Sequence, residues 1–393
     1  MRPVPVVASV LFLACSTVLR AQDTVLVVAD GPPVWGEAPA LVEELRIGVL
    51  EGAEEEVFGA VGGVAVTPKG AILVADIQVP VVRVFSPQGA YLGDAGRRGE
   101  GPGEYRSLQG VRRHPEGFAL WDPGNARVSI FDEDGRFLRS FRVPSGLYTS
   151  DAFQVDTVGN FYVRSSQWTD PATGAVTGQG WLVIDSVGEV RGSIPLPEAE
   201  PEGPDFQISA REGPLHPFTI RTQATLSPDG YRVDGRTDAW ALHRPLAGGR
   251  VLRIQRTLTP VEPTRGERTQ WERWIEFFHE RTGQRFGSLP DKKPAFHDFF
   301  VDDDGRFWVR RYVPAVEGPD RMRPSPERPP FTWREPATFD VVSSRGRFLG
   351  TVVFPLETRP RVSRGLHVWA TMAGEFGETY VVRFRIEPGE GQS

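Results

Sequence analysis

The chain has 393 residues, of which 39% are hydrophobic and 24% charged, and its formal net charge at pH 7 is −6. This composition is typical of a globular protein with a large core. The net negative charge argues against nucleic acid and anionic lipid as partners. The single cysteine excludes an intramolecular disulfide framework.

The first 21 residues have the features of an export signal. Arg2 forms a short basic region, residues 4–19 are apolar, and Ala21 stands directly before a predicted cleavage site. Two alternatives remain, a lipoprotein anchored through Cys15 and a transmembrane anchor, for which the apolar run is short. Cleavage removes two arginines and no acidic residue, which leaves a net charge of −8 and no cysteine. We therefore expect an exported protein, periplasmic or secreted.

Two alternating sets of glycine-ended turns run through the chain. The first set ends at Gly70, Gly117, Gly159, Gly230 and Gly305, and the second at Gly89, Gly135, Gly188, Gly249 and Gly346. Apolar strands flank these turns, so each pair of turns marks four strands. Glycine is favoured there because a positive φ costs least without a Cβ. The first-set glycines lie 47 and then 42 residues apart, the size of a four-stranded propeller blade.

The period predicts an all-β fold, a six-bladed β-propeller with four-stranded antiparallel blades over residues 42–390. Blades begin near residues 61, 107, 151, 221, 296 and 361. The sixth blade has strands at 367–371 and 379–387 and then lacks a fourth. Residues 45–52 are an isolated apolar segment ahead of the first blade. We expect this N-terminal strand to close the last blade and remove an open sheet edge.

Residues 261–294 interrupt the strand pattern and predict the one helical insertion. Thr264 and Glu267 form a capping box, and apolar residues recur at helical spacing after it. We expect an amphipathic helix over residues 265–281.

The role of this helix is open at the level of sequence. Its aromatic residues Trp271 and Trp274 either pack on the propeller surface or form a lid beside the mouth of the channel. Insertions at residues 198–217 and 314–334 are too rich in proline for regular strands, and we predict that they form further loops beside a binding face.

Residues 94–140 carry a family resemblance. A glycine-rich segment is followed by a strand ending in Asp122, then by Asn125 and Arg127, and then by a strand ending in Phe131. This order resembles the NHL repeat of exported bacterial six-bladed propellers, which are related to TolB-type propellers. In such blades the acid and the arginine hold the loop between the second and third strands. The resemblance therefore implies a structural role for Asp122 and Arg127, as a partly buried ion pair.

Polar residues stand eight positions before the first-set glycines, near the start of the innermost strands. They are Gln109, Asp151, Thr222 and His297, with Gly62 in the first blade. The residues six positions before the same glycines are apolar, as packing between blades requires: Val64, Val111, Phe153, Ala224 and Phe299. We expect the polar set to gather at one mouth of the central channel, as a ligand site or as the wall of a water-filled channel.

The six histidines show no metal-ligand spacing, and no catalytic constellation is evident. We therefore expect a non-enzymatic propeller that binds a protein, peptide or glycan. We predict a monomer with no cofactor, metal, nucleic-acid partner or transmembrane anchor. The alternative is a calcium-dependent hydrolase, such as a lactonase or esterase of the six-bladed class, although the four polar residues make a poor calcium cage. A general base at His297 with Asp298 orienting it is disfavoured, because strand neighbours point to opposite faces.

Overall fold

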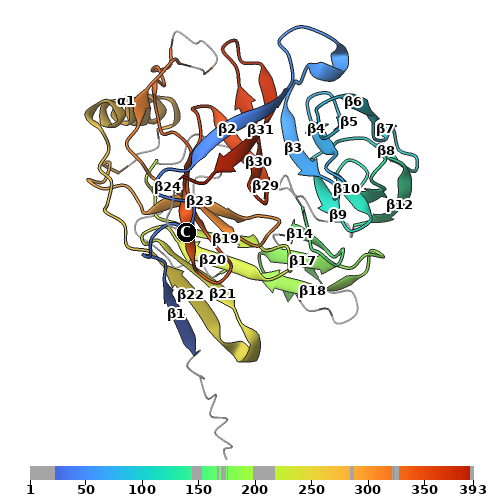
Figure 1. Cartoon of the computed structure of the whole chain (residues 1–393), viewed down its shortest axis with the longest axis horizontal. Helices are drawn as coiled ribbons and strands as arrows, with labels where there is room; N and C mark the ends of the chain where they lie inside the picture. The colour runs from blue at the N-terminus through green and yellow to red at the C-terminus, as the bar shows by residue number, and fades with distance from the viewer. Residues whose placement is uncertain are drawn as a thin grey trace, which may run out of the picture.

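The structure is a computed structural model that describes residues 23–143, 153–165, 168–169, 174, 176–197, 217–283, 287–320, 322 and 327–389. In these residues, six sheets of antiparallel strands surround a central channel, and Figure 1 looks roughly along the channel axis. The predicted six-bladed propeller is confirmed.

The first three blades follow one another along the chain, and the strands of each run from the channel outward. Blade 1 contains β3 (Val61–Val66), β4 (Ile72–Asp76), β5 (Val81–Phe85) and β6 (Tyr91–Asp94). Blade 2 contains β9 (Gly110–His114), β10 (Gly117–Asp122), β11 (Arg127–Phe131) and β12 (Phe137–Arg142). Blade 3 contains β13 (Gln154–Val155), β14 (Phe161–Ser165), β17 (Gly180–Ile184) and β18 (Val190–Pro195).

The other three blades carry the additions to the basic pattern. Blade 4 contains β19 (Thr222–Leu226), β20 (Arg232–Arg236), β21 (Ala241–Pro245) and β22 (Val251–Gln255). Blade 5 contains β23 (Phe296–Val301), β24 (Phe307–Arg311), β27 (Thr338–Val342) and β28 (Phe348–Val353). Blade 6 contains β29 (Thr358–Arg364), β30 (His367–Ala373), β31 (Thr379–Glu387) and β2 (Ala40–Ile47). Its inner strand thus begins three residues before the predicted position.

Shorter elements lie in the connections. They are the paired strands β7 (Arg97–Arg98) and β8 (Glu104–Tyr105), the hairpin β15 (Trp168–Thr169) and β16 (Val176–Thr177), the hairpin β25 (Val316–Glu317) and β26 (Trp333–Arg334), and two 3₁₀ turns, η1 (Glu54–Glu56) and η2 (Ala247–Gly249).

The N-terminal strand β2 closes blade 6. It pairs antiparallel with β31, and Ile47 lies opposite Val381. The predicted ring closure is confirmed, but the prediction that the strand covers residues 45–52 is wrong, because β2 ends at Ile47. The next residue, Gly48, has a φ of 116°, and a Cβ there would lie 2.9 Å from the Thr379 carbonyl oxygen. The strand therefore ends where the backbone requires glycine.

A further N-terminal strand, β1 (Thr24–Val28), extends blade 4. It pairs in parallel with β22, the outermost strand of that blade, and makes the sheet five-stranded. The periodicity gives no signal for β1, because this strand has no hairpin partner next to it in the sequence.

The glycine-ended turns adopt the expected conformation, as at Gly70 and Gly89, where φ is 89° and 87°. Side chains at the first turn position add hydrogen bonds. Asp156 Oδ1, for example, accepts hydrogen bonds from the Val158 and Asn160 amides at 3.0 and 2.8 Å. The polar first residue and the final glycine thus both stabilise such a turn.

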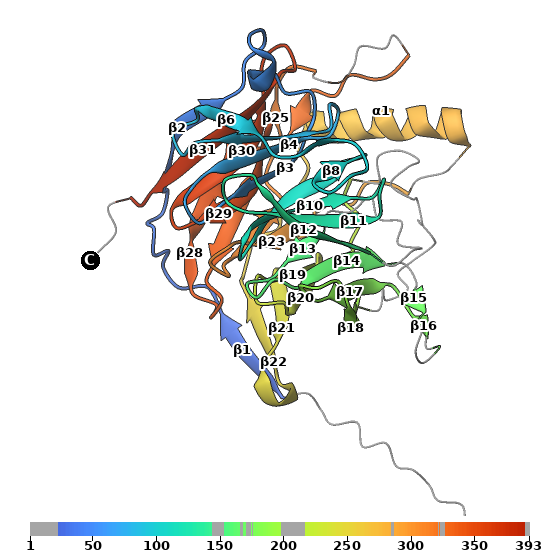
Figure 2. The ribbon, with the colours of Figure 1, turned by 90° about the vertical axis from the view of Figure 1, so that its right-hand side faces the viewer.

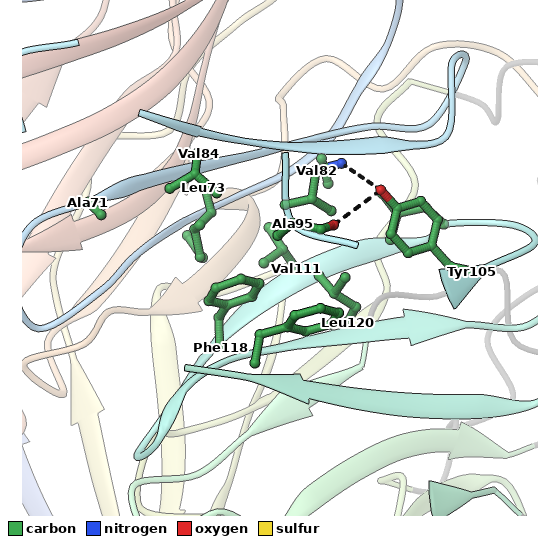
Figure 3. Packing of buried hydrophobic residues seen from close by; sticks show 13 residues of the cluster. Ala71, Leu73, Val82, Val84, Ala95, Tyr105, Val111, Phe118 and Leu120 are labelled. Carbon is green, nitrogen blue, oxygen red and sulfur yellow. Dashed lines mark hydrogen bonds between the residues drawn. The ribbon is translucent and has the colours of Figure 1, made fainter. Parts of the chain in front are cut away.

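Blades pack on one another through apolar side chains. Leu73 of blade 1 packs against Val111, Phe118 and Leu120 of blade 2, and all four are fully buried (Figure 3). The apolar set predicted for interblade packing lies in such clusters: Val64, Val111, Phe153 and Phe299 are buried, and Ala224 packs against its cluster partly buried.

The helix α1 (Arg265–Thr282) confirms the predicted insertion and its capping box. It packs against the β25–β26 hairpin, where the Gln270 side chain accepts hydrogen bonds from the Thr332 and Trp333 amides at 2.7 and 2.8 Å. Figure 2 shows that α1 and the β15–β16 hairpin extend from the same side of the ring. Over the described parts of the chain, no helix combines the length and the apolar character of a membrane span.

Ile47 provides a test of the ring closure, because it is only 3% exposed, in a cluster with Phe58 and Val381. The change Ile47→Ala should lower the free energy of unfolding by about 2–5 kcal/mol, as loss of a large buried side chain does. Leu50 lies just beyond β2 and is 47% exposed, so Leu50→Ala should change it by less than about 0.5 kcal/mol. Urea denaturation measures both, and equal effects would contradict the closure.

Candidate functional site

A cavity of about 1430 Å³ occupies the central channel. Its lining includes Gln109 and His297, near the start of their inner strands, and Pro228 and Asp303, in the turns at the other end. We call the end where the inner strands begin the entry mouth. The helix α1 and the β25–β26 hairpin lie at this mouth, because both belong to connections that leave or enter strands there.

The structure brings two of the four predicted polar residues to the cavity. Gln109 and His297 line it, whereas Thr222 is exposed and is not among the lining residues. The next residue, Gln223, does line the cavity. Asp151 lies outside the described residues.

Strand alternation explains this division. Positions eight and six before the turn glycine share a face, and the residues at position six pack between blades. The lining residues Arg112, Gln154 and Thr225 stand five positions before their glycines, on the opposite face. Gln109 and His297 are exceptions. Gln109 lies just before β9 begins, and at His297 the β23–β24 register shifts between Phe296 and Asp298. A bulge of this kind changes the direction in which a side chain points. His297 accordingly lines the cavity.

His297 forms the main polar contact at the entry mouth. Its Nε2 lies 3.2 Å from Glu335 Oε2, and its ring stacks on Tyr312 at 3.5 Å between centroids. Burial lowers the pKa of His297, although Glu335 opposes this effect. The imidazole is therefore neutral at pH 7, and Nε2 must donate because an ionised carboxylate only accepts. No described residue hydrogen bonds to Nδ1, which is left as the acceptor of the ring.

Lys293 fixes Glu335 from the other side. It is 4% exposed, and its Nζ donates to Glu335 Oε1 at 3.0 Å, to Glu267 Oε1 at 2.8 Å and to the Val313 carbonyl at 2.8 Å. All three ammonium hydrogens are thereby used. Burial alone would raise the pKa of Glu335, but His297 and Lys293 outweigh it and lower the pKa. Glu335 is therefore an ionised, fixed acceptor for His297.

Sequence reasoning missed this network. Glu267 was recognised only as a helix cap, and Lys293 and Glu335 were not singled out. The partners lie 26, 38 and 42 residues apart along the chain. They meet only because the insertions before and within blade 5 fold over the same mouth, and no local spacing signals that meeting.

Charged residues dominate the polar lining of the cavity. Among the described lining residues, seven are arginines and seven are acidic. Several of the acids are paired: Glu357 with Arg334, Asp302 with Arg306, and Glu335 with Lys293. Most of the lining arginines are thus left to face the cavity without a described acid within 4.0 Å.

The two helix tryptophans have different positions. Trp271 lines the cavity and contacts Phe331 edge to face, with 5.2 Å between ring centroids. Trp274 is 4% exposed and donates a hydrogen bond to the Pro330 carbonyl at 3.3 Å. The helix therefore packs through Trp274 and presents Trp271 to the channel. Whether it moves as a lid remains a prediction.

Asp122 and Arg127 hold the connection into blade 2. Asp122 accepts hydrogen bonds from the Arg106 and Ser107 amides, both at 3.0 Å, and Arg127 donates to the Gly101 carbonyl at 2.9 Å. The two side chains have no N···O contact within 4.0 Å, so they act through the backbone of this connection and not as a direct ion pair.

Blade 1 has the same arrangement. Asp76 accepts hydrogen bonds from the Gly59 and Ala60 amides at 2.7 and 3.1 Å, and Arg83 donates to the Val57 carbonyl at 3.2 Å. In this blade the two side chains also approach each other directly, with 3.6 Å between Arg83 Nη1 and Asp76 Oδ2. The recurrence supports a structural role for both pairs.

The predicted alternative of a calcium site depends on side chains that gather around a cation. Within the ranges that the structure describes, no group of three or more His, Cys, Asp or Glu residues suits a metal ion. Asp151, the acid of the predicted cage, is not among those residues.

Lys293 offers a test of the network. The change Lys293→Met leaves two buried carboxylates without their cation and should lower the free energy of unfolding by about 3–5 kcal/mol at pH 8. Without the cation, the folded-state pKa of the carboxyls rises above the unfolded value, so the loss should shrink as the pH falls toward 5. The exposed neighbour Lys292 provides the control. Lys292→Met should lower the free energy of unfolding by less than about 0.5 kcal/mol. Equal losses in urea denaturation at both pH values would disprove the coupling.

Comparison with known proteins finds similarity only among solved structures, since no protein-family profile and no curated protein matches the chain. A protein of Bacteroides fragilis named for its inferred export is 12% identical and covers 92% of this chain and 99% of its own, with a TM-score of 0.48. A member of the DUF4221 family from Bacteroides vulgatus is 10% identical, covers 90% and 99%, and has a TM-score of 0.47. An inactive virginiamycin B lyase from Staphylococcus aureus with quinupristin is 12% identical, covers 88% and 99%, and has a TM-score of 0.40. Similarity at this level assigns neither a ligand nor an activity.

Proposed function

We propose that this chain is an exported binding protein that takes a small molecule or a peptide segment into its central channel through the entry mouth. The observation that carries the proposal is the cavity of about 1430 Å³, which is lined by aromatic, histidine and arginine side chains. Ligand sites are typically concave and combine apolar walls with a few convergent polar groups.

The entry mouth has both kinds of group. Trp271, Phe331 and Tyr312 supply aromatic surface, and His297 and Gln109 supply polar atoms. His297 lies on β23 and Trp271 on α1, and the Tyr312 hydroxyl donates a hydrogen bond to the Pro217 carbonyl at 2.9 Å. These three side chains are therefore held in place and need little ordering on binding.

Export and kinship with NHL-type propellers form part of the proposal. Export is supported by the features of residues 1–21 in the sequence. The kinship is supported by the Asp76–Arg83 and Asp122–Arg127 pairs, which bind the backbone of the preceding connection in the same way in two successive blades.

Filling the channel tests the proposal. Gln109 lines the cavity, and Gln109→Trp would place a large side chain in it. Binding should first be sought with peptide and glycan arrays and by mass spectrometry of molecules that copurify with the protein. The Gln109→Trp variant should then bind the captured ligand at least about tenfold more weakly, which is a loss of about 1.4 kcal/mol.

The matched control places the same residue on the outside of the same blade. Leu138 lies on β12 and is 44% exposed, so Leu138→Trp should bind as the unaltered protein does. Equal binding by the two variants would place the ligand outside the channel. Failure of all searches to capture a ligand would count against the proposal.

A second candidate function is acid–base catalysis at the entry mouth. The observation that favours it is the His297–Glu335 contact of 3.2 Å, in which an ionised carboxylate orients a neutral imidazole. Such a histidine can accept a proton from a bound substrate, as a general base requires. Turnover of a captured ligand that is lost in His297→Asn would support this candidate over simple binding. The calcium-dependent hydrolase stays a prediction that awaits metal analysis of the purified protein.

The pKa of His297 provides an independent measurement. Because Glu335 raises this pKa against the larger effect of burial, Glu335→Gln should lower it further. In the unaltered protein, ¹⁵N NMR of the imidazole should find mainly the neutral form, with the proton on Nε2, at pH 7. Any catalysis by this base should fall as the pH drops through its pKa, because the protonated ring cannot accept a proton. A doubly protonated ring at pH 7 would refute the assignment.

A further inference from the structure

The inner strands of two blades bring three arginines to the channel. Arg112 lies on β9 of blade 2, and Arg359 and Arg361 lie on β29 of blade 6, so β3 of blade 1 stands between them around the ring. All three side chains line the cavity. They are called the arginine triad below.

Neutral groups, and no acids, hold Arg361 and Arg112 of the triad in place. Arg361 donates to Thr371 Oγ1 at 3.1 Å and to the Val61 carbonyl at 3.2 Å, and Arg112 donates to the Val111 carbonyl at 2.9 Å. Among the described residues, no carboxylate lies within 4.0 Å of a triad nitrogen.

Three nearby arginines differ from the triad in this respect. Arg113 and Arg364 approach Asp303 at 3.8 and 3.6 Å, and Arg334 pairs with Glu357. Among the seven lining arginines, Arg221 and Arg310 resemble the triad, because no described acid lies within 4.0 Å of them. The triad differs from these two in its clustering, since the charges of Arg359 and Arg112 both act on Arg361.

Burial and the neighbouring positive charges disfavour the charged state of the triad. Burial, followed by the charges of Arg359 and Arg112, lowers the pKa of Arg361 to about 10. Burial also lowers the pKa of Arg112, and Asp303 offsets this only in part. A cation that is partly desolvated beside other cations gains most from a bound anion.

We propose that the arginine triad is an oxyanion subsite, and that the ligand of the channel carries a carboxylate or phosphate group that the three guanidinium groups bind. The inference rests on the proposed function and names the ligand class. Guanidinium groups suit this task because their planar N–H forks match two oxygens of a carboxylate or phosphate. An anion between the two strands also compensates positive charge that Asp303 offsets only in part.

The first test measures anion binding to the purified protein. Thermal unfolding should be followed with citrate, pyrophosphate and sodium chloride at matched ionic strength. Citrate or pyrophosphate, but not chloride, should raise Tm by several degrees at concentrations well above Kd. A larger effect of citrate identifies a carboxylate ligand, and a larger effect of pyrophosphate identifies a phosphate ligand. Equal shifts with chloride would overturn the subsite.

Substitution locates the site. Arg359 makes no side-chain hydrogen bond to a described residue, so Arg359→Gln should preserve the fold while weakening anion binding by at least about tenfold in titration calorimetry. Arg361→Lys keeps the positive charge but removes the planar guanidinium group that can donate to two oxygens at once, so it should weaken anion binding as well. The control is Arg345→Gln, on an exposed turn of blade 5 away from the cavity lining. If Arg359→Gln and Arg345→Gln bind the anion equally, the triad is a structural feature only.

Failure of the subsite and failure of channel binding give different results. If Gln109→Trp abolishes capture of the ligand while Arg359→Gln captures it normally, the channel binds a ligand and the oxyanion subsite is wrong. If anions stabilise the protein through Arg359 while captured ligands are unaffected by Gln109→Trp, the subsite stands and the proposed route into the channel is wrong.

Discussion

The pairing of β2 with β31 is the constraint on which the rest of the molecule depends. Without β2, blade 6 would lack its outer strand and expose the edge of β31. Ile47 brings an apolar side chain into the cluster that joins blade 6 to blade 1. The ends of the chain thus close the ring, and closure fixes the distance between inner strands on opposite sides of the channel.

The closed ring and its insertions bury a network of charged side chains at the entry mouth. Lys293 is surrounded by two carboxylates and a carbonyl that come from the helix and from the insertions around blade 5. Each charge is desolvated, and each is paired. This network attaches α1 to the propeller at its first turn and, at the same time, orients His297 at the entry mouth.

The channel consequently has two chemically distinct regions. At the entry mouth, the imidazole of His297 stacks on Tyr312 and is oriented by Glu335, whereas the arginine triad carries positive charge with no described carboxylate within 4.0 Å. A ligand with an apolar or aromatic part and an anionic group would satisfy both regions together. The overall net charge of −6 gives no indication of this local excess of positive charge.

The sequence by itself determined the blades, because each hairpin is encoded locally by a turn residue and a glycine with positive φ, as at Gly70 and Gly89. It also determined α1, whose cap and apolar spacing are local, and it indicated that an N-terminal strand closes the ring. Only the tertiary structure decided which side chains meet in the channel. A single bulge in β23 changes the face to which His297 belongs, and Glu335 reaches it from 38 residues away. Such contacts depend on strand register and on the paths of the insertions. Both are set by packing of the whole ring, so no periodic pattern in the local sequence signals them.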